Sequence, residues 1–222
     1  SLRKNMQEMG SALISANIMG NATTAQFAEA LAGRYAAQLL LTGKGEAEGL
    51  AVLNMLAQRG IKGRAAGTQA TMLFRDLPRA AIRRASAWRE AGLSLYDGSG
   101  EMKHAADIIQ MFEEKVMPLP TEDQDKLLHD LGLNRLILST VKTLMGTSKG
   151  IRTSEARIKE DQKANIAEKI AERRMESANA QLKLLKKELV LFLAEAVPDL
   201  SKLFKGLTKV VRVLSEDVPN GF

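Results

Sequence analysis

Apolar residues recur three or four positions apart along most of this chain, and that period marks one face of an α-helix. Polar and charged residues stand between them, as expected of helices with one buried and one solvated face. The pattern predicts successive helices over residues 2–19, 23–41, 46–58, 63–77, 78–91, 104–117, 121–131 and 133–145. Ala66 and Gly67 are small, so another helix can approach closely there. The predicted fold class is all-α, with a multi-helix globular core.

Short patterns predict where some of these helices begin. Thr23 and Gln26 have the spacing of a capping box, in which the threonine oxygen accepts an amide proton that has no partner inside the helix. Residues 121–124, Thr-Glu-Asp-Gln, repeat this spacing and place acids in the first turn, where the helix dipole favours them. Pro78 is interpreted as the first residue of its helix, because that position needs no amide proton.

A turn signal interrupts the helical pattern after residue 92. Residues 93–96 alternate between apolar and polar side chains, and Asp97-Gly98 follows them. Asp-Gly favours a tight turn because glycine adopts a positive φ without a steric penalty. We therefore expect one short β-turn or hairpin near residues 93–102.

The pattern changes after residue 146, and this change defines the predicted domains. Residues 1–146 are assigned to a helical core domain, 147–152 to a linker, and 153–222 to a long helix followed by a C-terminal amphipathic helix. Residues 153–197 contain neither Gly nor Pro. This predicts one helix of roughly 45 residues, which would be about 65–70 Å long at about 1.5 Å per residue.

The second half of that long helix carries a heptad seam, which requires a partner helix. Its positions are Ala178, Leu182, Leu185, Leu189, Phe192 and Ala196. Because the seam spans under three heptads, packing within the chain and a coiled-coil homo-oligomer both remain open. Residues 199–214 predict an amphipathic helix with one broad apolar face. We expect this face to pack on the core or on a partner, or to contact a membrane transiently.

Composition and charge support this picture without adding a site. Hydrophobic residues make up 45% of the chain and aromatic residues only 4%, which favours helices over sheets. There is no cysteine, so disulfides and thiolate chemistry are excluded. The net charge is +6, but the basic excess is spread along the chain. A dedicated nucleic-acid-binding protein usually clusters its basic residues on one face.

One basic stretch is a candidate interaction surface. Arg79, Arg83, Arg84 and Arg89 lie on the helix predicted over 78–91, with Trp88 among them. A basic face with one tryptophan suits an anionic partner, and it equally suits a solvated surface. The seam residues Leu182, Leu185, Leu189 and Phe192 are the second candidate interaction surface.

No residue pattern indicates catalysis, a cofactor or a metal. The loop over residues 42–45 contains Gly-Lys but lacks the phosphate-loop order of residues. The acids at 113–114 and 122–125 have no histidine at ligand spacing, so capping and solvation account for them. His104 and His129 lie on separate predicted helices, so we interpret neither as catalytic. We expect a protein that is not an enzyme.

Three segments in a fixed order carry a resemblance to a known family. Residues 56–68 read Leu-Ala-Gln-Arg-Gly-Ile-Lys-Gly-Arg-Ala-Ala-Gly-Thr, 92–102 read Gly-Leu-Ser-Leu-Tyr-Asp-Gly-Ser-Gly-Glu-Met, and 106–112 read Ala-Asp-Ile-Ile-Gln-Met-Phe. Together they resemble the core domain of the phage tail tape measure protein family. Gln58 and Arg59 depart from the family pattern, which has small residues there.

The resemblance implies a structural role in a phage or prophage tail. A tape measure protein lies in the tail lumen, sets tail length during assembly, and is ejected with the DNA on infection. The implied partners are tail tube proteins, tail-tip or baseplate proteins, and tail assembly chaperones. The resemblance also implies synthesis in the bacterial cytoplasm and a final location in the virion tail. The chain begins with Ser and is short for such a protein, so we expect a fragment.

The residues also leave an alternative open, which is a basic helical module that binds nucleic acid or protein without catalysis.

The sequence shows no secretory signal peptide and no apolar run of the roughly 18 residues that a membrane span requires.

Overall fold

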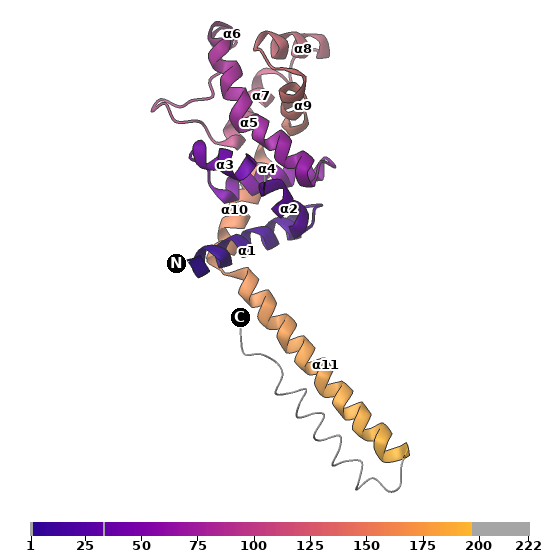
Figure 1. The fold of residues 1–222 in the computed structure, drawn as a ribbon. Helices are drawn as coiled ribbons and strands as arrows, with labels where there is room; N and C mark the ends of the chain where they lie inside the picture. The colour runs from indigo at the N-terminus through magenta and orange to yellow at the C-terminus, as the bar shows by residue number, and fades with distance from the viewer. Residues whose placement is uncertain (1, 33, 197–222) are drawn as a thin grey trace. The chain divides into compact units, whose positions relative to one another are not determined.

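The computed structural model describes residues 2–32 and 34–196, and the side chains of residues 7–32, 34–185 and 187. The chain divides after Lys169 into two compact units, 1–169 and 170–222. The described residues form helices α1 Leu2–Met19, α2 Thr24–Leu31, α3 Arg34–Leu41, α4 Glu46–Gln58, α5 Gly63–Arg83, α6 Ala85–Glu90, α7 Ala105–Lys115, α8 Thr121–Asp130, α9 Arg135–Leu144, α10 Ser148–Lys163 and α11 Ile166–Ala196 (Figure 1). The predicted all-α fold is confirmed.

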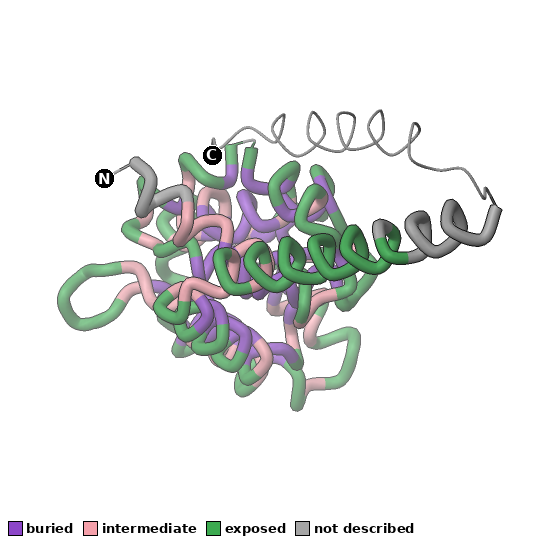
Figure 2. The backbone as a smooth tube through the Cα atoms, turned by 90° about the horizontal axis from the view of Figure 1, so that it is seen from below, coloured by how far each residue is buried: buried purple, intermediate pink, exposed green. Residues whose placement is uncertain are grey.

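Helix α4 is the centre of the first unit. Every residue from Ala47 to Ala57 is buried, as expected of a helix that is apolar on all sides. It packs on α1, α5 and α10 and also touches α2, α3 and α9. Figure 2 shows the buried backbone gathered inside this unit. The sequence pattern predicted both ends of α4 correctly.

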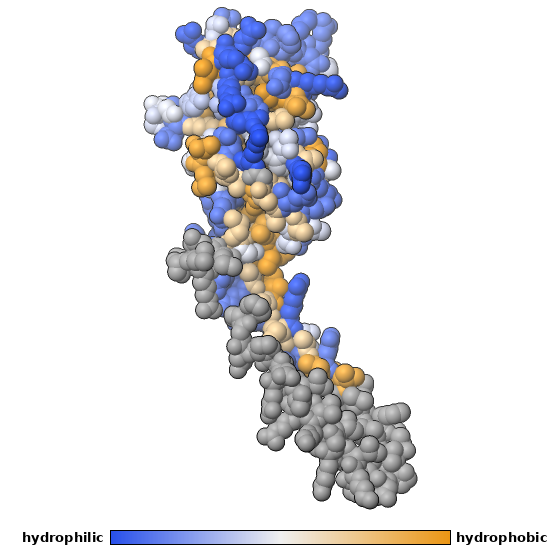
Figure 3. Space-filling model, in the orientation of Figure 1, coloured by the Kyte–Doolittle hydropathy of each residue, from blue (hydrophilic) through white to orange (hydrophobic). Residues whose placement is uncertain are grey.

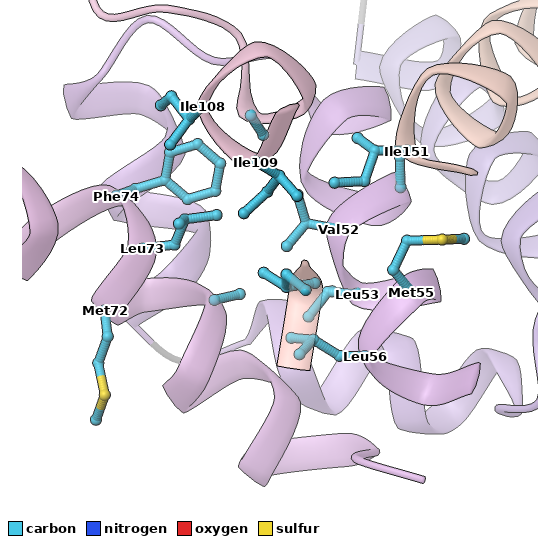
Figure 4. Packing of buried hydrophobic residues seen from close by; sticks show 14 of the residues in the cluster. Val52, Leu53, Met55, Leu56, Met72, Leu73, Phe74, Ile108, Ile109 and Ile151 are labelled. Atoms are coloured by element: carbon cyan, nitrogen blue, oxygen red, sulfur yellow. The ribbon is translucent and has the colours of Figure 1, made fainter. Parts of the chain in front are cut away.

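Side chains from four helices meet at the core. Figure 4 shows Val52 of α4, Leu73 and Phe74 of α5, and Ile109 of α7 pointing toward one another. Ile151 of α10 approaches the same cluster, and it is fully buried. These residues are far apart in the sequence, so the core holds the first unit together from α4 through α10.

Helices α2 and α5 cross closely at Gly67. A Cβ added to Gly67 would stand 2.3 Å from the carbonyl oxygen of Ala30 and 2.9 Å from its Cα. Such distances are far below van der Waals contact, so only glycine fits at this position. The close approach that the sequence predicted at Gly67 is confirmed.

Pro78 lies inside α5, and the prediction that it begins a new helix was wrong. A proline in a helix interior leaves the carbonyl four residues earlier without its amide donor. Here that carbonyl belongs to Phe74, and the side-chain Nε2 of Gln38 donates to it at 3.3 Å. A tertiary hydrogen bond from α3 therefore replaces the missing one, and α5 continues to Arg83.

The helix predicted over 23–41 is two helices, α2 and α3. The Thr23 capping box is present: Gln26 donates its amide to Thr23 Oγ1 at 3.2 Å, and Thr23 donates its amide to Gln26 Oε1 at 3.0 Å. Helix α2 ends at Leu31, and α3 begins at Arg34.

The predicted turn is present near residues 93–102. Tyr96 and Met102 form one antiparallel β-bridge. The carboxylate of Asp97 closes the turn by accepting the amides of Ser99 at 2.9 Å and Glu101 at 3.0 Å. The short hairpin is therefore where it was expected, but the positive φ lies at Gly100, at 84°, and not at Gly98 of the Asp-Gly pair.

The capping box predicted over 121–124 is wrong, because α8 begins one residue earlier than that pattern requires. Pro120 is the N-cap residue and has no side-chain cap, and Thr121 is already helical. The side chain of Gln124 instead donates to the carbonyl of Leu119 at 2.8 Å. The acids Glu122 and Asp123 do lie in the first turn, as predicted.

The predicted single helix over 153–197 is broken after Ala164. Asn165 has a φ of 49°, in the left-handed region that asparagine tolerates better than most residues. Helix α10 ends before it and α11 begins after it. Residues 147–152, assigned to a linker from the sequence, are helical from Ser148 onward, and Ile151 among them is buried in the core.

Helix α10 belongs to the first unit because it packs on α1, α4 and α7. A buried polar contact fixes it to α1: the Ser15 hydroxyl donates to Asp161 Oδ2 at 2.7 Å, and Arg157 donates to the same oxygen at 3.1 Å. Ile158 beside them is fully buried. The first part of the helix predicted over 153–197 therefore belongs to the core.

The second unit is described only through α11, which continues to Ala196. Every residue from Ala171 to Leu185 on this helix is exposed, and Figure 2 shows the same stretch in green. The amphipathic helix predicted over 199–214 lies outside the described residues.

Candidate functional site

A strip of arginines follows one face of α5. Arg75, Arg79 and Arg83 stand four residues apart, so they lie on the same face with a rise of about 6 Å per step. Figure 3 shows strongly hydrophilic side chains in a strip over α5 and α6. We call Arg75, Arg79 and Arg83 the basic strip.

One acid partly neutralises the basic strip. Arg75 donates two hydrogen bonds to Asp76, at 2.8 and 2.7 Å, and Arg79 lies 3.6 Å from the same carboxylate. These bonds from Arg75, with the charges of Arg79 and Arg83, hold the pKa of Asp76 below its usual value. In the part of the chain that the structure describes, Arg83 forms no ion pair with an acid.

The structure separates the four arginines that the sequence placed on one helix. Arg79 and Arg83 lie on α5, but Arg84 stands at the break between α5 and α6. The Arg84 side chain packs over Gly132, 2.8 Å from where a Cβ would stand. Arg89 lies on α6 and donates to the carbonyl of Ala85 at 3.4 Å. Arg84 and Arg89 therefore do not continue the face formed by Arg79 and Arg83, and the basic surface is smaller than the sequence predicted.

A groove runs along α5 beside the basic strip, with α2 and α3 on its other side. It consists of two hollows of about 300 and 490 Å³, and Arg75 lines both. The first hollow lies near Arg34 and Arg64 and the second near Leu41 and Arg79. We call the two together the α3–α5 groove. No pattern in the sequence predicted it, because it depends on how α3 packs beside α5.

The second candidate surface is the seam of α11. Leu182 and Leu185 are both 54% exposed, and Met175 one heptad earlier is also exposed. Leu189 and Phe192 lie on α11, and their side chains are outside what the structure describes. The described part of the seam is thus an apolar stripe in contact with solvent.

A partly buried polar cluster lies where α4, α7 and α10 meet. The His104 ring has Nε2 3.4 Å from Glu48 and Nδ1 3.4 Å from Glu155. Glu48 is 2% exposed, and its other oxygen accepts the Ala105 amide at 2.7 Å, at the start of α7. Lys159 pairs with Glu155 at 2.5 Å. Burial raises the pKa of Glu48, although the Ala105 amide and His104 act in the opposite direction.

This cluster serves to join three helices, and the sequence analysis missed it. Glu48 was the available signal, because it is an acid within a helix that is mostly apolar from Ala47 to Ala57. His129, by contrast, lies on the surface beside Asp130 at 3.8 Å. Glu113 caps α10 by accepting the amides of Gly146 and Ser148, both at 2.9 Å. Capping thus accounts for Glu113, as the sequence analysis expected.

The described residues show neither a metal-binding group nor a membrane-spanning helix. They contain no group of three or more His, Cys, Asp or Glu residues placed to hold a metal ion. None of the helices described is both long enough and apolar enough to span a bilayer.

The comparison with protein families identifies the class of protein. A helical unit with exposed basic and apolar surfaces fits a protein that assembles with others, and the family model described as "Phage-related minor tail protein" matches residues 1–132. The match covers more than half of the chain, so the chain belongs to this family and is a phage tail component. The comparisons with curated proteins and with solved structures gave no match.

Proposed function

We propose that this chain is part of a tape measure protein, which occupies the tail lumen, sets tail length during assembly and leaves with the DNA. The observation that carries the proposal is α11, within a chain of the minor tail protein family. It is 31 residues long, and its side chains are exposed from Ala171 to Leu185. A helix of fixed rise converts residue number into length, which is what a length-setting protein needs.

The proposed partners follow from the two surfaces. The exposed leucines of α11 need a partner helix, which a second copy of the chain or another tail protein supplies. Tail tube, tail-tip or baseplate proteins and tail assembly chaperones are the candidates. The role is structural, and the proposal includes no catalytic step.

Nucleic-acid binding through the basic strip is the second candidate function. Arg83 favours it, because it is exposed and has no acidic partner among the described residues. Asp76 weighs against it, because this carboxylate takes up two of the hydrogen bonds of Arg75 and would repel a phosphate. Binding of duplex DNA that weakens steeply with salt and is lost on Arg83→Ala would favour this function.

Location in the lumen can be tested by protease protection. Intact virions and virions emptied of DNA are treated with protease, and the chain is followed with an antibody to residues 1–169. We expect the chain to be protected from protease in intact virions. After DNA release, we expect it to be absent from the emptied tails and present in the released material. Cleavage in intact virions at the rate seen for the isolated chain would place it on the outside and contradict the proposal.

A further inference from the structure

We propose that the α3–α5 groove binds an acidic amphipathic helix of a partner protein. This inference concerns the first unit alone, and it does not depend on the length-setting role of the chain. It rests on the shape, the apolar rim and the charge of the groove.

The groove has two facing walls of helical side chains. Arg34, Gln38 and Leu41 lie along α3, spaced four and three residues apart, and residues 29–30 of α2 continue this wall at the first hollow. Arg64 to Arg79 form the wall on α5, a distance of about 22 Å or four helical turns at about 1.5 Å per residue. The two hollows meet at Arg75. A helix of four to five turns matches this length, and helices in grooves are a common mode of recognition.

Part of the groove lining is apolar and in contact with solvent. Leu41 lines it and is 81% exposed, although it belongs to an eight-residue helix whose inner face is filled by Tyr35 and Leu39. Pro78 and Met102 line the same hollow. Figure 3 shows hydrophobic side chains beside the hydrophilic strip on this face. Covering Leu41 would remove apolar area from water and so favour binding.

The charge of the groove selects an acidic partner. Four arginines line its two hollows, namely Arg34, Arg64, Arg75 and Arg79. Arg64 has only a long contact with Glu29, at 3.8 Å, and both side chains are largely exposed. Glutamates that flank an apolar stripe on a partner helix would meet these arginines, which gives orientation as well as attraction.

The same features disfavour nucleic acid as the occupant. A strand of nucleic acid needs a continuous cationic track, and aromatic side chains on which bases stack. Here Glu29 and Glu101 line the hollows, Asp76 holds Arg75, and Leu41 stands at the rim. An acidic helix with leucines on one face fits both the apolar and the basic parts.

The test measures binding of a defined peptide to the full chain by fluorescence anisotropy. The probe is a labelled 18-residue peptide that has leucines at positions i, i+3, i+4 and i+7 and glutamates beside them. The first control is a peptide of the same composition in scrambled order, and the second is a 20-base-pair DNA duplex. The variants are Leu41→Ser and Arg79→Glu, both at exposed positions, so each is expected to fold.

The chain offers a matched control for each variant. Leu40 is 82% exposed and adjacent to Leu41 but does not line the groove, so Leu40→Ser tests loss of an exposed leucine elsewhere. Arg89→Glu changes charge equally on α6, outside the groove. We expect the patterned peptide to bind with a micromolar Kd, with about tenfold weaker binding for Leu41→Ser and for Arg79→Glu. Leu40→Ser and Arg89→Glu should stay within about twofold.

Several results would overturn the inference. The scrambled peptide binding as tightly as the patterned one would show attraction by charge alone. Equal losses for Leu40→Ser and Leu41→Ser would remove the groove from the account. Tighter binding of the DNA duplex than of the peptide at 150 mM salt, or no peptide binding up to 1 mM, would also overturn it.

Discussion

Replacing Gly67 by leucine is expected to destabilise the first unit by about 3 kcal/mol or more, which is the upper end of the cost of overpacking. The reason is the crossing of α2 and α5. The added Cβ would stand 2.3 Å from the Ala30 carbonyl oxygen, and this neighbour is backbone, which cannot rotate out of the way as a side chain can. The two helices would have to separate, and the core beneath them would lose its packing. For a chain of this size the melting temperature should fall by about 6–12 °C.

Thermal unfolding followed by circular dichroism would measure this effect. Gly98→Ala is the matched control, because no atom lies within 4 Å of its added Cβ and the residue stands in an exposed turn. Gly67→Ala should give an intermediate loss of about 1–3 kcal/mol. Equal melting temperatures for Gly67→Leu and Gly98→Ala would show that the α2–α5 crossing is not as close as described.

Replacing Trp88 by alanine is expected to cost about 3–5 kcal/mol, the usual range for a large buried aromatic residue. Trp88 is 3% exposed, and its ring packs edge-on against Phe112 with 6.0 Å between centroids. Its indole N–H donates to the Leu131 carbonyl at 2.9 Å. The residue therefore connects α6 with α7 and with the turn after α8.

Urea unfolding followed by circular dichroism would measure the loss for Trp88→Ala. Trp88→Phe keeps most of the packing and removes only the hydrogen bond, so it should cost about 1–3 kcal/mol through the unpaired Leu131 carbonyl. Ile82→Ala is the control, because Ile82 on α5 is exposed and its loss should change stability by less than about 0.5 kcal/mol. A loss for Trp88→Ala no larger than that of Ile82→Ala would contradict the described packing.

Local patterns predicted those features that depend on neighbouring residues. The ends of α4, the Thr23 capping box and the turn at Asp97 are set within a few positions of the chain, and each was found where expected. The small Gly67 also indicated its helix crossing. The heptad seam of α11 predicted an interaction surface; Leu182 and Leu185 are exposed, and the interaction itself stays a prediction.

Features that depend on distant residues were not predictable in this way. Pro78 stays inside α5 because Gln38 on another helix bonds the Phe74 carbonyl. The helix predicted over 153–197 breaks at Asn165, and its first part lies in α10, which packs on α1 and α4. The cluster of Glu48, His104 and Glu155 comes from three helices, and periodicity along one helix carries no information about it.

The α3–α5 groove has the same origin. Leu41 and Arg79 lie on separate helices, and only the packing of α3 beside α5 makes them walls of one groove. The sequence analysis placed Arg79 on a basic face, but it could not place an exposed leucine opposite it. A partner for this groove was therefore not among its expectations.

The measurement that tests the central claim most directly is tail length as a function of helix length. Whole heptads are deleted in frame from the region of α11 in the intact gene, leaving residues 1–169 unchanged, and tails are measured by electron microscopy. The control replaces the same residues by unrelated heptads of equal length, which should leave tail length unchanged. The account predicts that tails shorten by about 1.5 Å for each residue removed, so that three deleted heptads shorten the tail by about 32 Å. Tails of unchanged length across the deletion series would contradict the length-setting role and favour a binding module in its place.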